Sequence, residues 1–316
     1  MLQNKTIAVV IPAYNEEKLI LKTLLSIPEY VDKIIVVNDN SKDRTLNEIV
    51  KFESDKLLLL NHEINQGVGG AIISGYQKAF DEKFDIAVVV AGDFQMDSSE
   101  MENVINPILS GEADYIKGNR LLSPKLVMEM PKARLLGNTI MSLLNKVATG
   151  YWHIMDSQCG FTALNLKILP QINLKGVYKR YGFPNDFLVK LNVRNITVKD
   201  VIVSPIYGEE KSGFNAFFII PKISTLLLRG FIYRMFWKYV IYDFHPLVFL
   251  YFFGSILILL GSLLGLEVLY LKFIYGAIAT YATVTLCALF LIVGLQSTLF
   301  AMMFDMLDNA SLKSKK

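Results

Sequence analysis

Polar residues follow four short apolar runs near the start of the chain, and these are the side chains best suited to chemistry. The runs lead into PAYNE (residues 12–16), NDNS (38–41), NQGVGGA (65–71) and AGDFQMD (91–97). In the last of these, Asp93 and Gln95 stand one residue apart, so their side-chain oxygens can reach the same ion. Divalent cations such as Mg2+ accept oxygen ligands of this kind. The four segments are therefore the candidates for a functional site.

Each segment taken alone also has a plainer explanation. NDNS is a common turn sequence, in which Ser41 or Asp43 caps the next helix, and Asp97 is equally suited to cap a helix that begins at Ser98. The glycines of NQGVGGA are typical of any loop. A dinucleotide-binding site would need a glycine-rich fingerprint directly after the first strand, where this chain has PAYNE, and no Gly-Lys-Ser/Thr sequence of a P-loop is present. These two classes of nucleotide site are excluded.

The apolar runs alternate with helical patterns, which predicts the elements that position these residues. Runs rich in Val, Ile and Leu predict buried parallel strands; they lie at 7–11, 33–37, 57–60 and 86–90. Helical spacing falls between them, at 16–26, 41–52, 69–80 and 98–109. This alternation predicts an α/β sheet with right-handed crossovers, in which ligands bind at the carboxyl ends of the strands.

Composition excludes several classes of protein. The 316 residues carry 32 Lys and Arg against 29 Asp and Glu, a net charge of +3 that is too balanced for a nucleic-acid binder acting through bulk charge. Cys159 and Cys287 are too few for a disulfide framework and match no zinc spacing. The hydrophobic fraction of 53% is high for a purely soluble enzyme and excludes a disordered chain.

The excess hydrophobicity lies near the C-terminus. Residues 246–266 and 273–304 carry no charge, and a bilayer core needs about 20 apolar residues in a helix. We therefore predict a transmembrane hairpin with its turn at 267–272; two buried helices of a soluble protein are the alternative, disfavoured because amphipathic spacing is absent. Lys and Arg flank the hairpin on its outer ends, which predicts that both termini are cytoplasmic. The N-terminal segment reads as a strand and not as a signal peptide.

The stretch before the hairpin mixes apolar residues with cations and aromatics. This composition predicts amphipathic helices in the membrane interface over residues 213–245, and the alternative is an ordinary amphipathic helix packed under the globular domain.

Taken together, the motifs resemble glycosyltransferase family 2, in the branch that makes polyprenyl-phosphate sugars. Besides the four segments above, the resemblance rests on GNR (118–120), DSQCGF (156–161) and YGEEKS (207–212), and it covers most of residues 5–212. It implies a GT-A-type nucleotide-sugar-binding sheet with helices on both faces. The expected organisation is a cytoplasmic catalytic domain (1–212), interfacial helices (213–245), the transmembrane hairpin (246–304) and a cytoplasmic tail (305–316).

The resemblance also implies roles for particular residues. Asp93 and Gln95 become the ligands of Mg2+ or Mn2+. The nucleotide-sugar site becomes Pro12, Tyr14, Glu16, Asp39, Gly67, Ala91, Gly92 and Asp93. Tyr14 would stack on the base unless it is a core residue, and Asp39 would contact the base or ribose unless it only makes a turn. Many relatives have Asp where this chain has Ala91, which leaves one carboxylate fewer near the metal.

The acceptor needs cations and no strong base, because a phosphate monoester is already anionic at pH 7. The candidates for its phosphate are Arg120, Arg134, Lys211 and Ser212. Asp156 is assigned by resemblance to the sugar or acceptor site, and it completes a catalytic set with Asp93, Gln95 and Arg120. Asp186 either contacts the sugar or caps a helix. His62, His153 and His245 are scattered along the chain and are interpreted as structural.

The resulting prediction is a multi-pass enzyme of the cell membrane. It would transfer a hexose, with glucose favoured, from a nucleotide-diphosphate sugar to polyprenyl (dolichyl or undecaprenyl) phosphate with inversion. A processive polysaccharide synthase is one alternative, although Arg234-Met-Phe-Trp237 does not match the Gln-x-x-Arg-Trp sequence of those enzymes. An inactive membrane scaffold is another, suggested only by Ala91. Gly254, Gly261 and Gly265 would allow the spans to pack within a chain or in a homo-oligomer.

Overall fold

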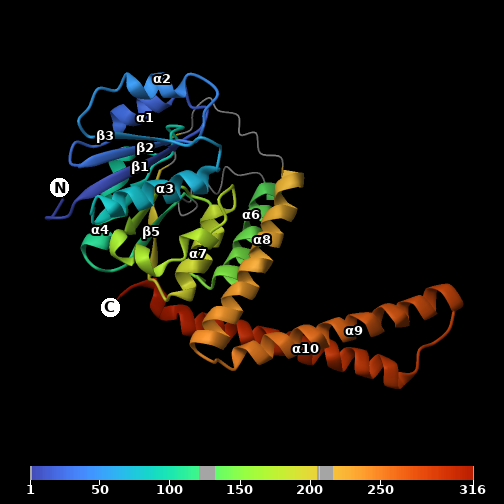
Figure 1. Ribbon diagram of the computed structural model, residues 1–316. Helices are drawn as coiled ribbons and strands as arrows, with labels where there is room; N and C mark the ends of the chain where they lie inside the picture. The colour runs from blue at the N-terminus through green and yellow to red at the C-terminus, as the bar shows by residue number, and fades with distance from the viewer. Residues whose placement is uncertain (1, 121–131, 205, 207–215, 316) are drawn as a thin grey trace. The chain divides into compact units, whose positions relative to one another are not determined.

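The computed structural model describes residues 2–120, 132–204, 206 and 216–315, with side chains for all of these except 132–138 and 216–220 (Figure 1). The chain forms two compact units. The first comprises residues 1–232 together with 311–316, and the second comprises residues 233–310.

The first unit is built on a seven-stranded sheet with the order β3-β2-β1-β4-β6-β5-β7. Its strands are β1 (Ile7–Ala13), β2 (Lys33–Asn38), β3 (Leu57–Asn61), β4 (Ile86–Val89), β5 (Tyr115–Asn119), β6 (Thr162–Asn165) and β7 (Val198–Ile202). The four strands predicted from the apolar runs, β1 to β4, pair parallel to one another, as expected. The sheet as a whole is mixed, because β6 runs antiparallel to both β4 and β5.

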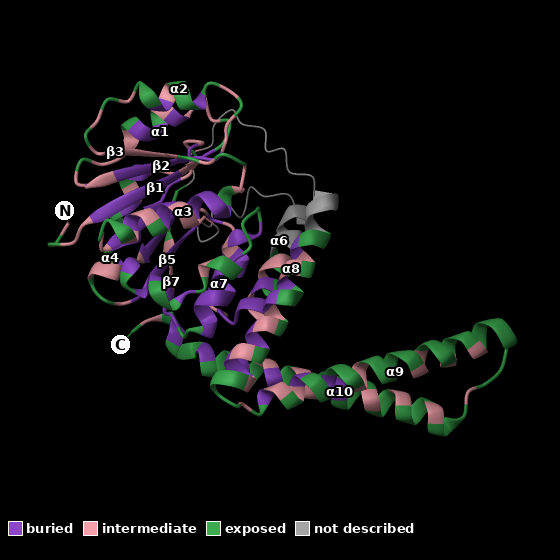
Figure 2. Ribbon diagram, viewed as in Figure 1, coloured by how far each residue is buried: buried purple, intermediate pink, exposed green. Residues whose placement is uncertain are grey.

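Both faces of the sheet are covered, which explains why β1 to β4 are apolar along most of their length. On β1, Ala8 and Val10 face one side, where α3 (Val68–Asp81) and α7 (Phe183–Val193) pack. Ile7, Val9 and Ile11 face the other side, which is covered by α1 (Ile20–Ser26), α2 (Thr45–Val50) and α4 (Met101–Leu109), the last preceded by the turn η1 (Ser98–Glu100). The predicted layering of helices on both faces is confirmed (Figures 1 and 2).

Two helices begin later than the sequence predicts. α1 starts at Ile20 instead of residue 16, and α2 starts at Thr45 instead of residue 41. The residues in between form two loops that hydrogen-bond to each other, and Asn15 and Asn40 adopt left-handed backbone conformations that no helix accepts. Tertiary contacts between loops therefore override the helical spacing at these positions.

The rest of the first unit packs at one end of the sheet. α6 (Lys132–Thr149) and α8 (Ala216–Phe236) contact each other through Ala148, Ile223 and Leu227. Two short turns, η2 (Leu166–Gln171) and η3 (Leu174–Gly176), lead from β6 to α7. Near the C-terminus, Leu312 is buried in the core cluster that includes residues of α7, and the Lys315 ammonium lies 2.6 Å from an Asp114 carboxylate oxygen.

The second unit contains a π-helical turn, η4 (Trp237–Tyr242), two long helices, α9 (Leu247–Tyr275) and α10 (Tyr281–Asp308), and the start of η5 (Asn309–Lys313). By length and composition, both long helices are apolar enough to cross a membrane. Most of their residues are exposed (Figure 2).

The hairpin turn lies later than predicted. α9 continues through residues 267–272 and ends at Gly276, whose φ of 60° gives the left-handed cap that commonly ends a helix. The glycines inside the hairpin allow its two helices to approach closely. A Cβ on Gly254 would lie 2.7 Å from the Thr298 hydroxyl, and one on Gly294 would lie 2.8 Å from the Ile258 nitrogen. Gly254 and Gly294 therefore allow the two helices of one chain to pack closely against each other.

Candidate functional site

Left-handed backbone occurs in the loops at the carboxyl edge of the sheet. Asn15, Asn40, Gly67 and Phe94 all have φ between 54° and 86°, and they follow β1, β2, β3 and β4 respectively. For a bulky residue such as Phe94 this conformation is strained, and such strain gathers at functional sites. Each of the four loops that the sequence singled out therefore contains a residue with left-handed backbone.

The loops after β1 and β2 form one cross-linked surface. The Ser41 hydroxyl accepts a hydrogen bond from the Asn15 amide at 3.1 Å, and the Thr45 hydroxyl accepts one from the Glu16 amide at 2.7 Å. Tyr14 projects from this surface with 45% of its area exposed, so the alternative that Tyr14 is a core residue is wrong. Its ring is available for stacking.

Asp39 organises the neighbouring loop. Its carboxylate accepts hydrogen bonds from the backbone amides of Gln66 at 2.8 Å and Gly67 at 2.7 Å, and it lies 2.7 Å from the His62 ring. The side chain is 3% exposed, so the carboxylate is engaged by the protein and does not face a ligand in this conformation. His62 also contacts Ser74, and it serves as a structural residue here.

The glycine-rich segment is packed against the protein and not open. The amides of Gly69 and Gly70 donate to the Lys179 carbonyl at 2.8 and 3.2 Å. A Cβ on Gly67 would lie 2.7 Å from the same carbonyl, so this position requires glycine for close approach as well as for its φ of 86°. The segment that makes these contacts, residues 178–181, was not among the predicted site residues.

The turn after β4 lies against the loop after β1. A Cβ on Gly92 would lie 3.3 Å from the Pro12 carbonyl and 3.5 Å from the Glu16 side chain, so the structure brings these three predicted residues together. The Ala91 amide lies 3.4 Å from the Met96 sulfur. An oxygen of Asp93 accepts from the Gln95 amide at 3.2 Å, across the strained Phe94.

Asp97 caps the turn that precedes α4. Its carboxylate accepts from the Ser99 amide at 3.0 Å and from the Ser99 hydroxyl at 2.6 Å. The structure therefore supports the capping role that the sequence indicated for Asp97.

The residues available for a divalent metal are oxygen donors of the appropriate type. Asp93 and Gln95 stand on one tight turn at the carboxyl edge of β4. Within the part of the chain that the structure describes, no three His, Cys, Asp or Glu side chains group together in a way that could hold a metal ion. The pair therefore fits a cation that takes most of its ligands from a bound diphosphate and water, as Mg2+ commonly does.

Arg120 follows β5 at the same edge of the sheet. Because β6 is antiparallel to both β4 and β5, β4 and β5 point in the same direction. The Arg120 guanidinium donates to both oxygens of Asp156, at 2.7 and 3.1 Å. Asp156 also accepts from the amides of Gln158 and Cys159, so it is held by the loop that contains it.

The surroundings of Asp156 favour its ionised form. Burial alone would raise the pKa of Asp156, but the hydrogen bonds and charge of Arg120 outweigh burial and hold that pKa below its usual value. The side chain of Asp156 is 4% exposed and that of Arg120 is 41% exposed. The structure therefore presents an oriented guanidinium to the surface, with its counter-ion buried beneath.

Two further charged residues lie behind this pair, and the sequence analysis missed both. The fully buried Lys117 donates to the Cys159 carbonyl at 2.9 Å, and burial lowers its pKa. Asp200, on the adjacent β7, accepts from Asn119 and from the Met155 amide, and burial raises its pKa to about 6. Both support the loop around Asp156. The signal in the sequence was a charged residue in the middle of each of two apolar strands.

Other predicted residues fall in different places. Asp186 lies in the first turn of α7, where its buried carboxylate accepts from the Tyr178 amide at 2.7 Å and burial raises its pKa. It therefore holds the 178–181 segment and does not cap the helix. Arg134 lies in the first turn of α6, but its side chain is outside the described set, and Lys211 and Ser212 lie outside the described residues.

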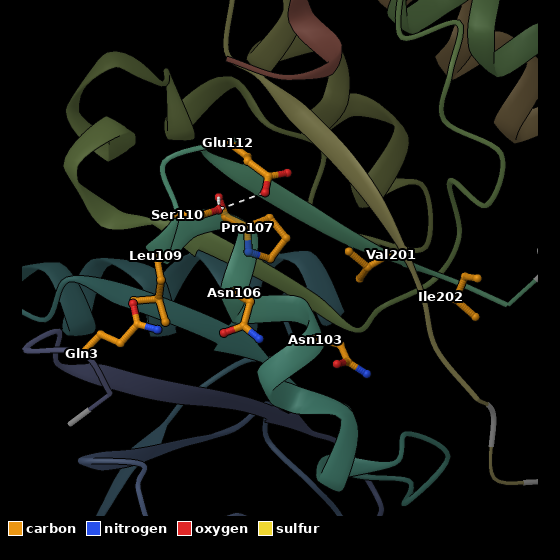
Figure 3. Close-up of a pocket in the computed structure, with 9 residues that line it drawn as sticks. All are labelled: Gln3, Asn103, Asn106, Pro107, Leu109, Ser110, Glu112, Val201 and Ile202. Atoms are coloured by element: carbon orange, nitrogen blue, oxygen red, sulfur yellow. Dashed lines mark hydrogen bonds between the residues drawn. The ribbon is translucent and has the colours of Figure 1, made fainter. Parts of the chain in front are cut away.

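A pocket of about 680 Å³ lies elsewhere, between α4, β7 and the N-terminal residues (Figure 3). None of the nine residues that line it is a predicted site residue. They are Gln3, Asn103, Asn106, Pro107, Leu109, Ser110, Glu112, Val201 and Ile202. The pocket is therefore lined by residues other than those of the candidate site.

Comparison with known proteins matches residues 8–172 to the family described as glycosyl transferase family 2. A UDP-N-acetylglucosamine–dolichyl-phosphate N-acetylglucosaminyltransferase from Methanococcus voltae is 32% identical over 221 residues, covering 65% of this chain and 88% of the relative. An undecaprenyl-phosphate mannosyltransferase from Micrococcus luteus is 25% identical over 210 residues, covering 64% and 85%.

Among solved structures, glucosyl-3-phosphoglycerate synthase from Mycobacterium tuberculosis in complex with Mg2+ and UDP is similar in fold. The TM-score is 0.53 at 17% identity, over 73% of this chain and 79% of that one. A complex of the same enzyme holds Mn2+. At this identity the likeness establishes the fold, and the expected GT-A-type sheet is confirmed.

Proposed function

This chain belongs to glycosyltransferase family 2 and is a glycosyltransferase, and on that premise we propose that it transfers a hexose from a nucleotide-diphosphate sugar to polyprenyl phosphate. The observation that carries the proposal is the half-exposed Arg120, oriented by buried Asp156 at the same sheet edge as the Asp93 turn. A fixed guanidinium suits a substrate phosphate, since its fork binds two oxygens at once. The names of the two relatives, whose acceptors are dolichyl and undecaprenyl phosphate, support a lipid phosphate.

The donor site is proposed at the cross-linked loops after β1, β2 and β4. Tyr14 would stack on the base, while Pro12, Glu16 and Gly92 shape the floor on which the nucleotide lies. Asp39 acts as a positioning residue in this proposal, because its carboxylate holds Gly67. A UDP sugar is favoured by the Methanococcus relative. Glucose remains the sugar favoured by the motifs, and N-acetylglucosamine is the alternative named in that relative.

Asp93 and Gln95 are proposed to hold Mg2+ or Mn2+. The metal, when bound, would supply a Lewis acid that stabilises negative charge on the leaving diphosphate. The chain's own contribution is a tight turn. In this turn the backbone amide of Gln95 donates to the Asp93 carboxylate and limits the positions that the carboxylate can take.

The acceptor phosphate is proposed to approach Arg120, with Arg134, Lys211 and Ser212 as further contacts. One of its oxygens would form a bond to the anomeric carbon of the sugar while the bond from that carbon to the nucleotide diphosphate breaks. Attack from the face opposite the leaving group inverts the anomeric configuration. No side chain needs to remove a proton, because the phosphate monoester is already ionised at pH 7.

The two long apolar helices are proposed to anchor the enzyme in the cell membrane, with the catalytic domain and both termini in the cytoplasm. Cations flank the outer ends of the hairpin, which favours this orientation. A lipid acceptor lies in the same membrane, so an anchored enzyme finds it by diffusion in two dimensions. A processive synthase is disfavoured, because α9 and α10 are the two helices in the described residues that are suited to spanning a membrane.

A lipid-extraction assay tests the proposal. Detergent-solubilised enzyme receives undecaprenyl or dolichyl phosphate with labelled UDP-glucose, UDP-N-acetylglucosamine or GDP-mannose, with Mg2+, Mn2+ or a chelator. We expect label in the organic phase with one donor, and we expect its loss on chelation and in Asp93→Ala. The matched control is Asp55→Ala, an exposed acid in the loop before β3. Absence of labelled lipid with every donor, from folded protein, would refute the proposal.

A further inference from the structure

Residues Tyr178, Lys179, Arg180 and Tyr181 form a segment that connects η3 to α7, here called the YKRY segment. Its backbone is attached to the carboxyl edge of the sheet. The Lys179 carbonyl accepts hydrogen bonds from the amides of Gly69 and Gly70, at the start of α3. The segment is therefore fixed to the loop that follows β3, which Asp39 in turn holds against the loop after β2.

The segment is also fixed on its other side, to α7. The Asp186 carboxylate accepts from the Tyr178 amide at 2.7 Å, and the Arg180 carbonyl accepts from the Phe183 amide at 2.8 Å. Asp186 is 8% exposed, so this attachment is buried. Hydrogen bonds at several points hold the backbone of the YKRY segment in one conformation, which limits the positions that its side chains can reach.

The side chains of Lys179 and Arg180 make different contacts. The Lys179 ammonium donates to the Gln66 side chain at 2.8 Å. Arg180 packs its aliphatic stem over Gly67, where a Cβ on the glycine would lie 3.0 Å from the Arg180 Cγ. Arg180 is exposed, and its guanidinium makes no hydrogen bond or ion pair with the described residues. The structure thus brings an uncommitted guanidinium to the loop after β3.

The other end of the segment is Tyr181, which is half-exposed. Burial raises the pKa of its phenol, and the charge of Arg120 has a smaller, opposite effect. The geometry that places Arg180 is its packing on Gly67, at the start of α3.

We propose that Arg180 is a binding residue for a phosphate group of the reacting pair, either the diphosphate of the donor or the monoester of the acceptor. The inference rests on the proposed function and adds a residue that the motifs did not identify. A planar guanidinium binds phosphate oxygens two at a time, and a preformed loop reduces the entropy lost on binding. Gly67 serves this arrangement, since any side chain there would displace the Arg180 stem.

The test compares Arg180→Gln and Arg180→Lys with Lys175→Gln. Lys175 is an exposed cation on η3, which makes the last variant a charge-matched control. Binding of UDP with Mg2+ is measured by calorimetry, which needs no turnover, and KM is measured separately for the sugar donor and for undecaprenyl phosphate. Thermal unfolding checks that each variant is folded.

We expect Arg180→Gln to weaken one of these phosphates by about 10-fold or more, with Arg180→Lys intermediate and Lys175→Gln unchanged, because a hydrogen bond to a charged group contributes on this order. A weaker Kd for UDP assigns Arg180 to the donor, and a higher KM for undecaprenyl phosphate alone assigns it to the acceptor. Unchanged values for both phosphates in Arg180→Gln overturn the inference. If wild-type enzyme transfers no sugar to lipid, the proposed function fails, while the UDP measurement still tests the donor assignment.

Discussion

Two bidentate Arg–Asp pairs among the described residues lie in contrasting surroundings. At the sheet edge, the side chains of Arg120 and Asp156 are 41% and 4% exposed. Near the base of the hairpin, those of Arg234 and Asp305 are both 0% exposed. The Arg120 side chain therefore reaches the surface, whereas Arg234 is enclosed by protein. In the proposed function the first pair serves phosphate binding, and the second pair has a structural role.

The pair near the hairpin base is part of a buried network. The Tyr239 hydroxyl donates to Asp305 at 2.7 Å, Asn309 donates to Asp305 at 3.0 Å, and Lys238 donates to Asn309 at 2.6 Å. Burial alone would lower the pKa of Arg234, but the charge of Asp305 raises it, so the guanidinium stays charged. The network joins the segment before α9 to the end of α10, and we infer that it sets the register of the hairpin.

Breaking the closed pair should have the largest effect on stability. Arg234→Met leaves Asp305 buried without its counter-ion, which costs about 3–5 kcal/mol. For a chain of this size we expect the Tm in detergent to fall by on the order of 10 °C. The double variant Arg234→Met, Asp305→Leu removes both charges and should recover much of the loss. Equal losses in the single and double variants would contradict this account of the network.

Breaking the open pair should affect activity more than stability. Asp156→Asn removes the charge that orients Arg120, and we expect kcat/KM for the lipid acceptor to fall about 10- to 100-fold, or about 1.4–2.7 kcal/mol. Because the folded-state pKa of Asp156 is lowered, the pair is intact at neutral pH and is lost only as the pH falls through that pKa, below the ordinary value of 3.8. A fall in Tm matching that of Arg234→Met, with normal kcat/KM, would reverse the assignment of the two pairs.

Asp200 extends the comparison to a buried acid that, among the described residues, is not paired with an arginine. Burial raises its pKa from 3.8 to about 6, so its ionised form destabilises the fold above that pH. As the pH falls from about 7 to about 4, the folded state takes up a proton before the unfolded chain does, and this group should add about 2 kcal/mol of stability. We expect Asp200→Asn to lose this component of the Tm–pH profile and Asp55→Asn to retain it. Parallel profiles for wild type and Asp200→Asn would contradict the shift.

An exposed pair should show the smallest effect. Lys5 and Asp85 lie 2.8 Å apart, with side chains 40% and 26% exposed, and Asp85 also accepts hydrogen bonds from Thr6. Lys5→Met should cost no more than about 1 kcal/mol, and high salt should reduce the difference. A loss approaching that of Arg234→Met, measured by thermal unfolding, would show that exposure does not rank these pairs.

Much of the fold was predictable because its signals are local. Buried parallel strands are apolar along their length, so β1 to β4 were recognisable from short runs, and the polar residues that end them marked the correct edge. The two apolar helices were recognisable from length and absence of charge. Their turn was misplaced because Glu267 and Lys272 resemble a loop, whereas the helix continues to the left-handed cap at Gly276.

The candidate site was predictable only in part, because several of its contacts join residues far apart in sequence. Asp39 was expected to face a ligand, but it is buried by amides 27 and 28 residues further along the chain. Nothing in the sequence indicates that the backbone amides of Gly69 and Gly70 donate hydrogen bonds to the Lys179 carbonyl. Arg180 belongs to none of the motifs recognised in the sequence, and only the packing of its side chain on Gly67 places it beside the loop after β3.

The sequence by itself determined which strands form, which residues end them and which helices are apolar enough for a membrane, because these properties depend on neighbours within a few positions. Only the tertiary structure decided that β6 lies between β4 and β5, that Asp156 orients Arg120 and that Asp305 forms a buried ion pair with Arg234. Burial determines what a charged pair does, and burial is set by chain segments distant in sequence. An Arg–Asp pair is therefore partly exposed in one unit and fully buried in the other.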